Sequence, residues 1–132
     1  METREVLQAH DVRPTIVRIR LYDYLKTMRN HPTIDTMYKS LHPEIPTLSK
    51  TSVYNTMQLF AEKRLVQTIT IEDNETRFDA DISDHGHFKC SGCGEVYDFD
   101  VDLSGLDHGL GQGFSISERH IYFKGSCPSC SR

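Results

Sequence analysis

Apolar residues recur at helical spacing in three stretches of the front half of the chain, which predicts three helices. The first helix runs through residues 17–28, with Pro14 near its first turn. The second runs through residues 34–41 behind Thr33, whose hydroxyl can cap it. The third covers about residues 49–63 and follows a loop that contains two prolines.

Two short runs of strand-forming residues follow the third helix and predict a hairpin. They span residues 66–71 and 76–80, and Asp73 and Asn74 lie between them as a turn. Three short helices followed by a hairpin have the layout of a winged helix-turn-helix. We therefore predict a winged-helix, DNA-binding domain over residues 1–80.

The back half of the chain predicts a smaller mixed domain over residues 81–132. Strand-like runs occur at residues 86–90, 95–99 and 114–123, and a short helix or irregular link crosses residues 103–110. The predicted fold class is therefore α+β, a winged helix-turn-helix followed by a small α/β domain.

Length and charge narrow the possible functions. The chain has 132 residues and is 37% hydrophobic, so its thin core needs support from a metal, disulfides or a partner subunit. Residues 1–66 carry a net charge of +3 and residues 67–132 one of −7. This asymmetry suits a front half that meets a polyanion and a back half that holds cations, although chance can also produce it. The sequence contains neither a bilayer-spanning apolar run nor a secretory signal, so we expect a cytoplasmic protein with no membrane partner.

The third predicted helix has an apolar face and a polar face. Its apolar stripe consists of Val53, Met57, Phe60 and Ala61, and its polar face of Thr51, Tyr54, Asn55 and Gln58. Amides and hydroxyls near a helix N-terminus suit base edges in a major groove, and Lys50 in the first turn suits a phosphate. Arg13 and Arg18, which flank the start of the first helix, can add phosphate or minor-groove contacts. An ordinary solvated surface is the competing interpretation.

The four cysteines form two pairs, and each pair has two intervening residues. The pairs are Cys90 with Cys93 and Cys127 with Cys130, and 33 residues separate them. Two such turns can bring four thiolates around one ion in a tetrahedral shell. Soft thiolates favour zinc or an iron–sulfur cluster, while unligated buried thiols or a redox dithiol are the alternatives.

A second cluster of candidate ligands offers nitrogen and oxygen atoms. His85 and His87 lie on one side of an extended segment, because side chains alternate along a strand. Asp79 precedes them, and Asp98 lies on the next predicted strand. If His31 from the front half joined these residues, one ion would clamp the two halves together. Imidazole and carboxylate ligands suit Fe(II), Mn(II) or Zn(II), while surface histidines are the simpler explanation of the pattern.

Together these motifs resemble the ferric uptake regulator (Fur) superfamily of bacterial metal-dependent repressors, and most of all its peroxide-sensing branch, PerR. The matching stretches lie between about residues 10 and 130: Arg13-Pro-Thr…Arg18, His31-Pro-Thr-Ile-Asp-Thr-Met-Tyr, Thr51-Ser-Val-Tyr-Asn-Thr-Met, Arg77-Phe-Asp79, Asp84-His-Gly-His87, Cys90-Ser-Gly-Cys-Gly-Glu-Val-Tyr-Asp98 and Gly125-Ser-Cys-Pro-Ser-Cys130. The resemblance implies a homodimer, joined through dimerisation domains over residues 81–132, that binds palindromic double-stranded operator DNA.

The resemblance also implies residue roles. A structural Zn(II) is implied at Cys90, Cys93, Cys127 and Cys130, and a regulatory Fe(II) or Mn(II) at His31, Asp79, His85, His87 and Asp98. DNA contacts are implied at Arg13, Arg18, Lys50, Thr51, Ser52, Tyr54 and Asn55. In the peroxide-sensing branch, bound Fe(II) reacts with hydrogen peroxide and oxidises a ligand histidine; His31 and His85 match those ligands. Asp79 and Asp98 stand where iron-responsive members often have Glu.

Two other functions fit some of the same motifs. One is a regulator of iron or other metal uptake on the same fold, without peroxide sensing. The other is a metal-dependent hydrolase that uses Asp79, His85, His87 and Asp98. The sequence offers a hydrolase no evident general base and no phosphate-binding glycine loop, and this function leaves the helix-turn-helix unexplained. We therefore expect a repressor rather than an enzyme.

Overall fold

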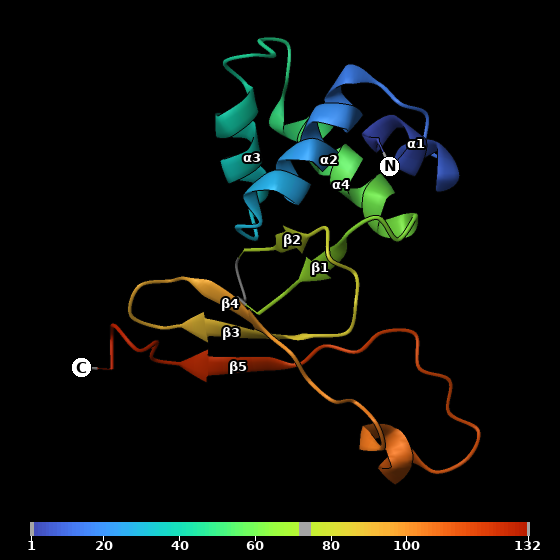
Figure 1. Cartoon of the computed structure of the whole chain (residues 1–132). Helices are drawn as coiled ribbons and strands as arrows, with labels where there is room; N and C mark the ends of the chain where they lie inside the picture. The colour runs from blue at the N-terminus through green and yellow to red at the C-terminus, as the bar shows by residue number, and fades with distance from the viewer. Residues whose placement is uncertain (1, 72–74, 132) are drawn as a thin grey trace. The chain divides into compact units, whose positions relative to one another are not determined.

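The computed structural model describes residues 2–71 and 75–131. The chain divides into two compact units, Met1–Ile82 and Ser83–Arg132. Each unit is a small α/β assembly of its own (Figure 1). Among the described residues, no helix combines the length and the apolar character that crossing a membrane requires.

The first unit is a winged helix-turn-helix. Four helices, α1 (Thr3–Ala9), α2 (Ile16–Met28), α3 (Ile34–Leu41) and α4 (Lys50–Glu62), precede the antiparallel strands β1 (Gln67–Ile69) and β2 (Arg77–Asp79). The three predicted helices and the two predicted strands are all present. The predicted turn at Asp73 and Asn74 lies outside the described residues.

Helix α1 is an addition to the three helices predicted from the sequence. Its single buried residue, Leu7, is fully withdrawn from solvent and belongs to the apolar core of the unit. A helix of seven residues offers too few apolar positions for periodicity to reveal it. The rest of the core comes mainly from α2, α3 and α4: Leu21, Tyr22, Leu25, Met37, Leu41, Val53, Met57 and Phe60.

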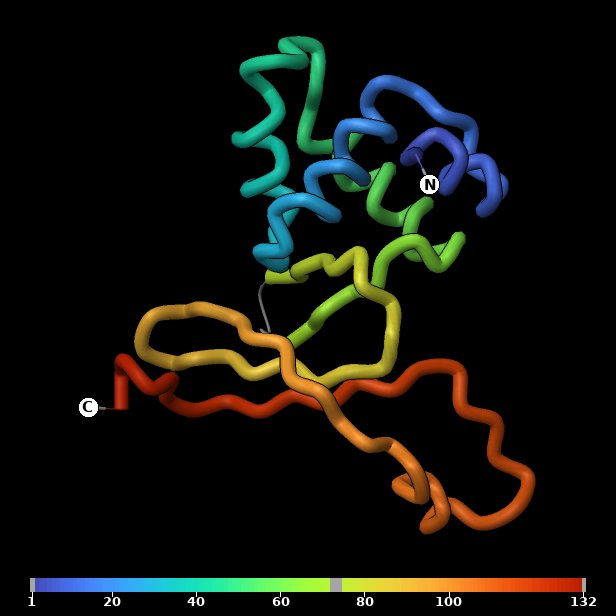
Figure 2. Tube along the Cα trace, in the orientation of Figure 1, coloured from blue at the N-terminus to red at the C-terminus, as the bar shows by residue number. Residues whose placement is uncertain are grey.

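The second unit contains a three-stranded sheet of order β4-β3-β5. Strand β3 (Gly86–Cys90) pairs antiparallel with β4 (Val96–Phe99) and parallel with β5 (Tyr122–Gly125). The connection from β4 to β5 leaves the sheet, carries the short 3-10 helix η1 (Leu106–Leu110), and returns as an extended segment (Figure 2). This helix lies within the predicted link.

The predicted strand over residues 114–123 is wrong for most of its length. Strand β5 begins only at Tyr122, and the segment before it is irregular. Phe114 and Ile116 alternate with polar residues as in a strand, but their side chains are 67% and 36% exposed. Within the described chain, the sheet provides this segment with no pairing strand, so alternation alone does not make it one.

Candidate functional site

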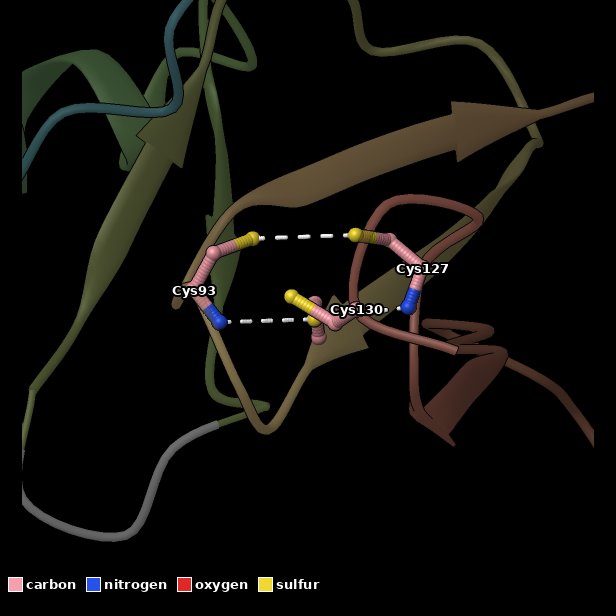
Figure 3. A group of neighbouring side chains, drawn as sticks. Cys93, Cys127 and Cys130 are labelled. Atoms are coloured by element: carbon pink, nitrogen blue, oxygen red, sulfur yellow. Dashed lines mark hydrogen bonds between the residues drawn. The ribbon is translucent and has the colours of Figure 1, made fainter. Parts of the chain in front are cut away.

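The four cysteines converge at one end of the second unit's sheet. Because β3 and β5 are parallel, with Cys90 opposite Gly125, the turns that follow both strands lie side by side. One ligand atom from each of Cys90, Cys93, Cys127 and Cys130 lies within 4.8 Å of all the others. Figure 3 shows the sulfurs of Cys93 and Cys127 facing each other, 3.8 Å apart. The structure therefore brings together all four predicted sulfur ligands.

The backbone around the cysteines is organised for a thiolate at Cys90. The N–H groups of Cys93 and Cys127 both donate to Sγ of Cys90, at 3.5 and 3.4 Å. These hydrogen bonds lower the pKa of Cys90 to about 6. A Cβ atom at Gly92 would lie 2.9 Å from Sγ of Cys130, so glycine is what allows the turn to pass so close to the sulfur.

The sulfurs are too crowded for all four to ionise by themselves. The neighbouring thiols Cys127 and Cys90 raise the pKa of Cys130 to about 12. The Cys127 thiolate likewise raises the pKa of the nearby Tyr97 hydroxyl to about 12. Only a bound cation would offset the negative charge of four thiolates, and four sulfurs at this spacing fit a tetrahedral metal ion.

A second group of ligand atoms lies across strands β3 and β4. His87 stands opposite Asp98 in the antiparallel register, and its Nε2 lies 3.3 Å from Oδ1 of Asp98. Nε2 of His85 lies 3.4 Å from the same oxygen, and the two imidazole rings have centroids 4.5 Å apart. The Nδ1 of His85 donates to the Ser83 carbonyl at 2.7 Å, which leaves a lone pair on Nε2 when the ring is neutral.

The first unit holds a separate imidazole–carboxylate pair. Nε2 of His31 lies 3.6 Å from Oδ2 of Asp79, and both side chains are nearly buried. Strand β2 fixes the His31 segment, because Arg77 Nη1 donates to the His31 carbonyl at 3.1 Å and Phe78 N–H donates to the Pro32 carbonyl at 3.1 Å. His31 itself has a φ of +49°, a left-handed conformation that costs energy in a non-glycine residue. A strained, buried histidine beside a carboxylate is typical of a functional position.

The predicted nitrogen and oxygen ligands therefore fall into two sets. His31 and Asp79 form a pair within the first unit. His85, His87 and Asp98 form a cluster within the second. Each set has the donor types that Fe(II), Mn(II) and Zn(II) accept, but two or three donors are fewer than such ions normally take from a protein.

The predicted DNA-contacting face lies on α4. Thr51, Tyr54, Asn55 and Gln58 are exposed, whereas Val53, Met57 and Phe60 are buried on the opposite side. The polar face predicted from the sequence is therefore exposed as expected. Its helix begins with a capping box: Ser52 N–H donates to the Ser49 hydroxyl at 3.1 Å, and Ser49 N–H donates to the Ser52 hydroxyl at 3.2 Å.

Two of the predicted DNA-contacting cations already have partners. Nζ of Lys50 lies 2.8 Å from Oδ1 of Asp35, and Nη1 of Arg18 donates to the Arg13 carbonyl at 3.0 Å. The second contact holds Arg18 close to Arg13, so these two predicted phosphate contacts lie together at the start of α2.

Comparison with known proteins identifies the family. The model of the ferric uptake regulator family matches residues 9–123. The chain belongs to this family. It is 36% identical to the "Peroxide operon regulator" of Bacillus subtilis (strain 168). The alignment has 136 positions and covers 99% of this chain and 92% of that protein. As a Fur-family member the chain is a transcriptional regulator. Family membership therefore favours this function over the hydrolase considered from the sequence.

Solved structures of the family share the fold. The Vibrio cholerae ferric uptake regulator superposes with a TM-score of 0.76 at 20% identity, covering 94% of this chain and 98% of that one. A structure of PerR from Streptococcus pyogenes, described as the basis for peroxide sensing and gene regulation, has a TM-score of 0.56 at 27% identity and covers 98% and 92% of the two chains. The family model and the Bacillus subtilis relative confirm the resemblance to the Fur superfamily, and these structures show the shared fold.

The sequence motifs did not reveal one residue beside the predicted DNA-contacting face. Asp35 lies in the first turn of α3 and pairs with both Lys39 and Lys50. The spacing of Asp35 and Lys39 is that of an ion pair along a helix, and this signal was available in the sequence. The pairing with Lys50 depends on how α3 and α4 pack, which local patterns do not reveal.

Proposed function

We propose that this chain is a metal-dependent, DNA-binding repressor that responds to peroxide. Family membership and the similarity to the peroxide operon regulator of Bacillus subtilis support the proposal. The observation that carries it is the pairing of imidazole with carboxylate in each of the two units. Neither set is a complete ligand shell, so we propose that one regulatory ion takes ligands from both.

The proposed regulatory ligands are His31, Asp79, His85, His87 and Asp98, with Fe(II) or Mn(II) as the ion. Because they belong to two units, shared ligation favours the arrangement in which the units come together. Loss of one ligand would weaken that preference. If Fe(II) were bound there, it would supply the one-electron chemistry that splits hydrogen peroxide, and His31 and His85 are the proposed sites of the resulting oxidation.

The proposed structural ion is Zn(II) at the four cysteines. The crowded sulfurs, the two N–H donors on Cys90 and the close approach of Gly92 support this assignment. We further propose that the second unit mediates a homodimer. It exposes several large apolar side chains that a second copy could cover: Tyr97, Leu106, Leu110, Phe114, Ile116 and Phe123.

The proposed DNA partner is a palindromic duplex, read by the two α4 helices of the dimer. Tyr54 and Asn55 are the proposed base-reading residues, and Thr51 and Ser52 complete that end of the helix. Because the Ser52 hydroxyl is engaged in the capping box, its contribution to DNA binding is to hold the helix start in place. Lys50, Arg13 and Arg18 are the proposed phosphate contacts.

The test is a gel-shift assay with a duplex selected from a random pool by the protein itself. Mn(II) should activate binding by the wild type but not by His85→Ala, because that variant loses a regulatory ligand. His108→Ala is the matched control, since His108 lies on the exposed helix η1. Metal-activated binding by His85→Ala would refute the proposed regulatory site.

Peroxide sensing is tested separately. After Fe(II) loading and mild peroxide treatment, mass spectrometry should find one added oxygen on the peptides that contain His31 or His85, and DNA binding should fall with it. A protein that binds DNA in a metal-dependent way but gains no oxygen would instead be a metal-uptake regulator without peroxide sensing.

A further inference from the structure

Two lysines beside the proposed DNA-contacting face share one carboxylate. Nζ of Lys50 lies 2.8 Å from Oδ1 of Asp35, and Nζ of Lys39 lies 2.9 Å from Oδ2 of the same residue. All three side chains are accessible, with exposed fractions of 60%, 73% and 44% for Lys50, Lys39 and Asp35. Each carboxylate oxygen thus holds one ammonium group, in the manner of a phosphate held between two cations.

The Lys50 ammonium has a second neighbour that fixes its position. It lies 5.7 Å from the centroid of the Tyr38 ring, within the range of a cation–π contact. Lys50 is also the first residue of α4, directly before the exposed Thr51. The ammonium is therefore held where the polar face of α4 begins.

The pairing is not explained by helix stability alone. Asp35 and Lys39 are four residues apart on α3, and such a pair stabilises its own helix. Lys50 belongs to a different helix, and Ser49 already caps that helix. The proximity of the lysines lowers the pKa of Asp35, and that of Asp35 raises the pKa of Lys50, so both remain charged across the neutral range.

We infer that Asp35 is an internal competitor for the DNA backbone, occupying between Lys39 and Lys50 the place of a phosphate group. The inference rests on the proposed DNA binding and adds two residues, Asp35 and Lys39, to it. A phosphate that approaches these lysines must displace the carboxylate or share their charge with it. Asp35 therefore lowers sequence-independent affinity and leaves a larger share of binding to base contacts.

The experiment measures binding of the full-length, zinc- and manganese-loaded protein to a fluorescein-labelled duplex of mixed sequence, by anisotropy over a range of KCl concentrations. Asp35→Asn should bind about two- to fivefold more tightly per protomer at low salt, the equivalent of one exposed ion pair. The plot of log K against log salt should steepen by about one ion per protomer. Adding Lys50→Gln to Asp35→Asn should abolish most of this gain.

Asp11→Asn is the matched control. It makes the same charge change and breaks a comparable pair, because Oδ2 of Asp11 lies 3.6 Å from Nζ of Lys63 at the other end of α4. This control should match the wild type. If Asp11→Asn and Asp35→Asn raised the affinity for the duplex equally, net charge alone would explain the effect and the inference would be overturned. The same holds if neither variant raised the affinity.

Failure of the proposed function gives a different result. If neither the wild type nor any variant binds the mixed duplex or a selected one, DNA binding itself is refuted, and the role of Asp35 with it. Thermal unfolding followed by circular dichroism checks each variant. If Asp35→Asn unfolds more easily than the wild type, Asp35→Ser, which also suits a helix start, replaces it with the same expected gain.

Discussion

The second unit should lose its fold when one cysteine ligand is removed. We consider Cys127→Ser, because the Cys127 side chain is buried beside Cys90 and its backbone N–H donates to the Cys90 sulfur. The substitution keeps the size of the side chain nearly constant but removes a thiolate ligand. The ion should then bind far more weakly, and the ends of β3 and β5 lose the cross-link between them.

The size of the expected loss of stability follows from how few other interactions stabilise this unit. Among its described residues, only three apolar side chains are buried: Cys90, Val96 and Cys127. Burial of each contributes at most about 3 kcal/mol, whereas ordering each residue of the backbone costs on the order of 1–2 kcal/mol. A four-thiolate zinc site contributes about 10–16 kcal/mol to folding. Its loss is as large as the net stability of about 5–15 kcal/mol that is typical of a whole domain, so the unit should unfold.

Hydrogen exchange followed by mass spectrometry measures unfolding separately in each of the two units. Peptides from β3 and β5 of Cys127→Ser should exchange as fast as an unfolded chain, while peptides from α2 and α4 keep their protection. Ser129→Ala is the control, because Ser129 lies between Cys127 and Cys130, is exposed and offers no sulfur. The reasoning is refuted if zinc-free Cys127→Ser retains protection in β3 and β5.

Three further predictions concern the metal site, the core and a helix cap. Zinc binding to the metal-free protein at neutral pH should release close to four protons, because unfolded thiols have a pKa near ~8.5. A site that stayed folded without metal would release fewer protons, because Cys90, with its pKa of about 6, would already be ionised. Calorimetry in buffers of different ionisation enthalpy counts the released protons and so distinguishes a folded from an unfolded metal-free site. Zinc affinity should also rise with pH up to about 8.5. Phe60→Ala should lower the free energy of unfolding of the first unit by about 3–5 kcal/mol in urea titrations, because Phe60 is fully buried and packs edge-on against Tyr22 at 6.0 Å; the same change at the exposed Phe114 should leave that unit unaffected. Ser49→Ala should cost about 1 kcal/mol of unfolding free energy through loss of the α4 cap, and an unchanged urea midpoint would contradict this role.

Local patterns in the sequence predicted the features that depend on nearby residues. Helices α2, α3 and α4 were predicted from apolar periodicity, and α3 also from a cap at Thr33, and the structure confirms all three helices. It also shows hydroxyl caps at Thr15 and Ser49 that were not predicted. The cysteine site was also predictable, because each pair is a local turn and parallel pairing of β3 with β5 brings the turns together. The helices are specified by local contacts, and the spacing of the cysteines indicates a metal site even before the pairing of its strands is known.

Features that depend on packing were predicted less well. Helix α1 is too short to show periodicity, although Leu7 is a fully buried member of the core. The segment before β5 alternates like a strand but has no pairing strand among the described residues. Asp35 has an obvious partner in Lys39 along its helix, but its second partner, Lys50, follows only from the packing of α3 on α4.

The two proposed groups of metal ligands differ in the equilibrium to which ion binding would be coupled. All four cysteines belong to the second unit, so binding of the proposed zinc ion would be coupled to the folding of that unit. The proposed imidazole and carboxylate ligands are divided between the units, so binding of the proposed regulatory ion would be coupled to an equilibrium between arrangements of folded units. The apparent affinity for the regulatory ion is then lowered in proportion to the fraction of molecules in which the ligands of both units are available together. Because of the same coupling, the arrangement of the units would depend on the concentration of the ion. The division of donors, two in one unit and three in the other, therefore suits reversible binding of a sensed ion, whereas the cysteine site suits a structural ion that stays bound.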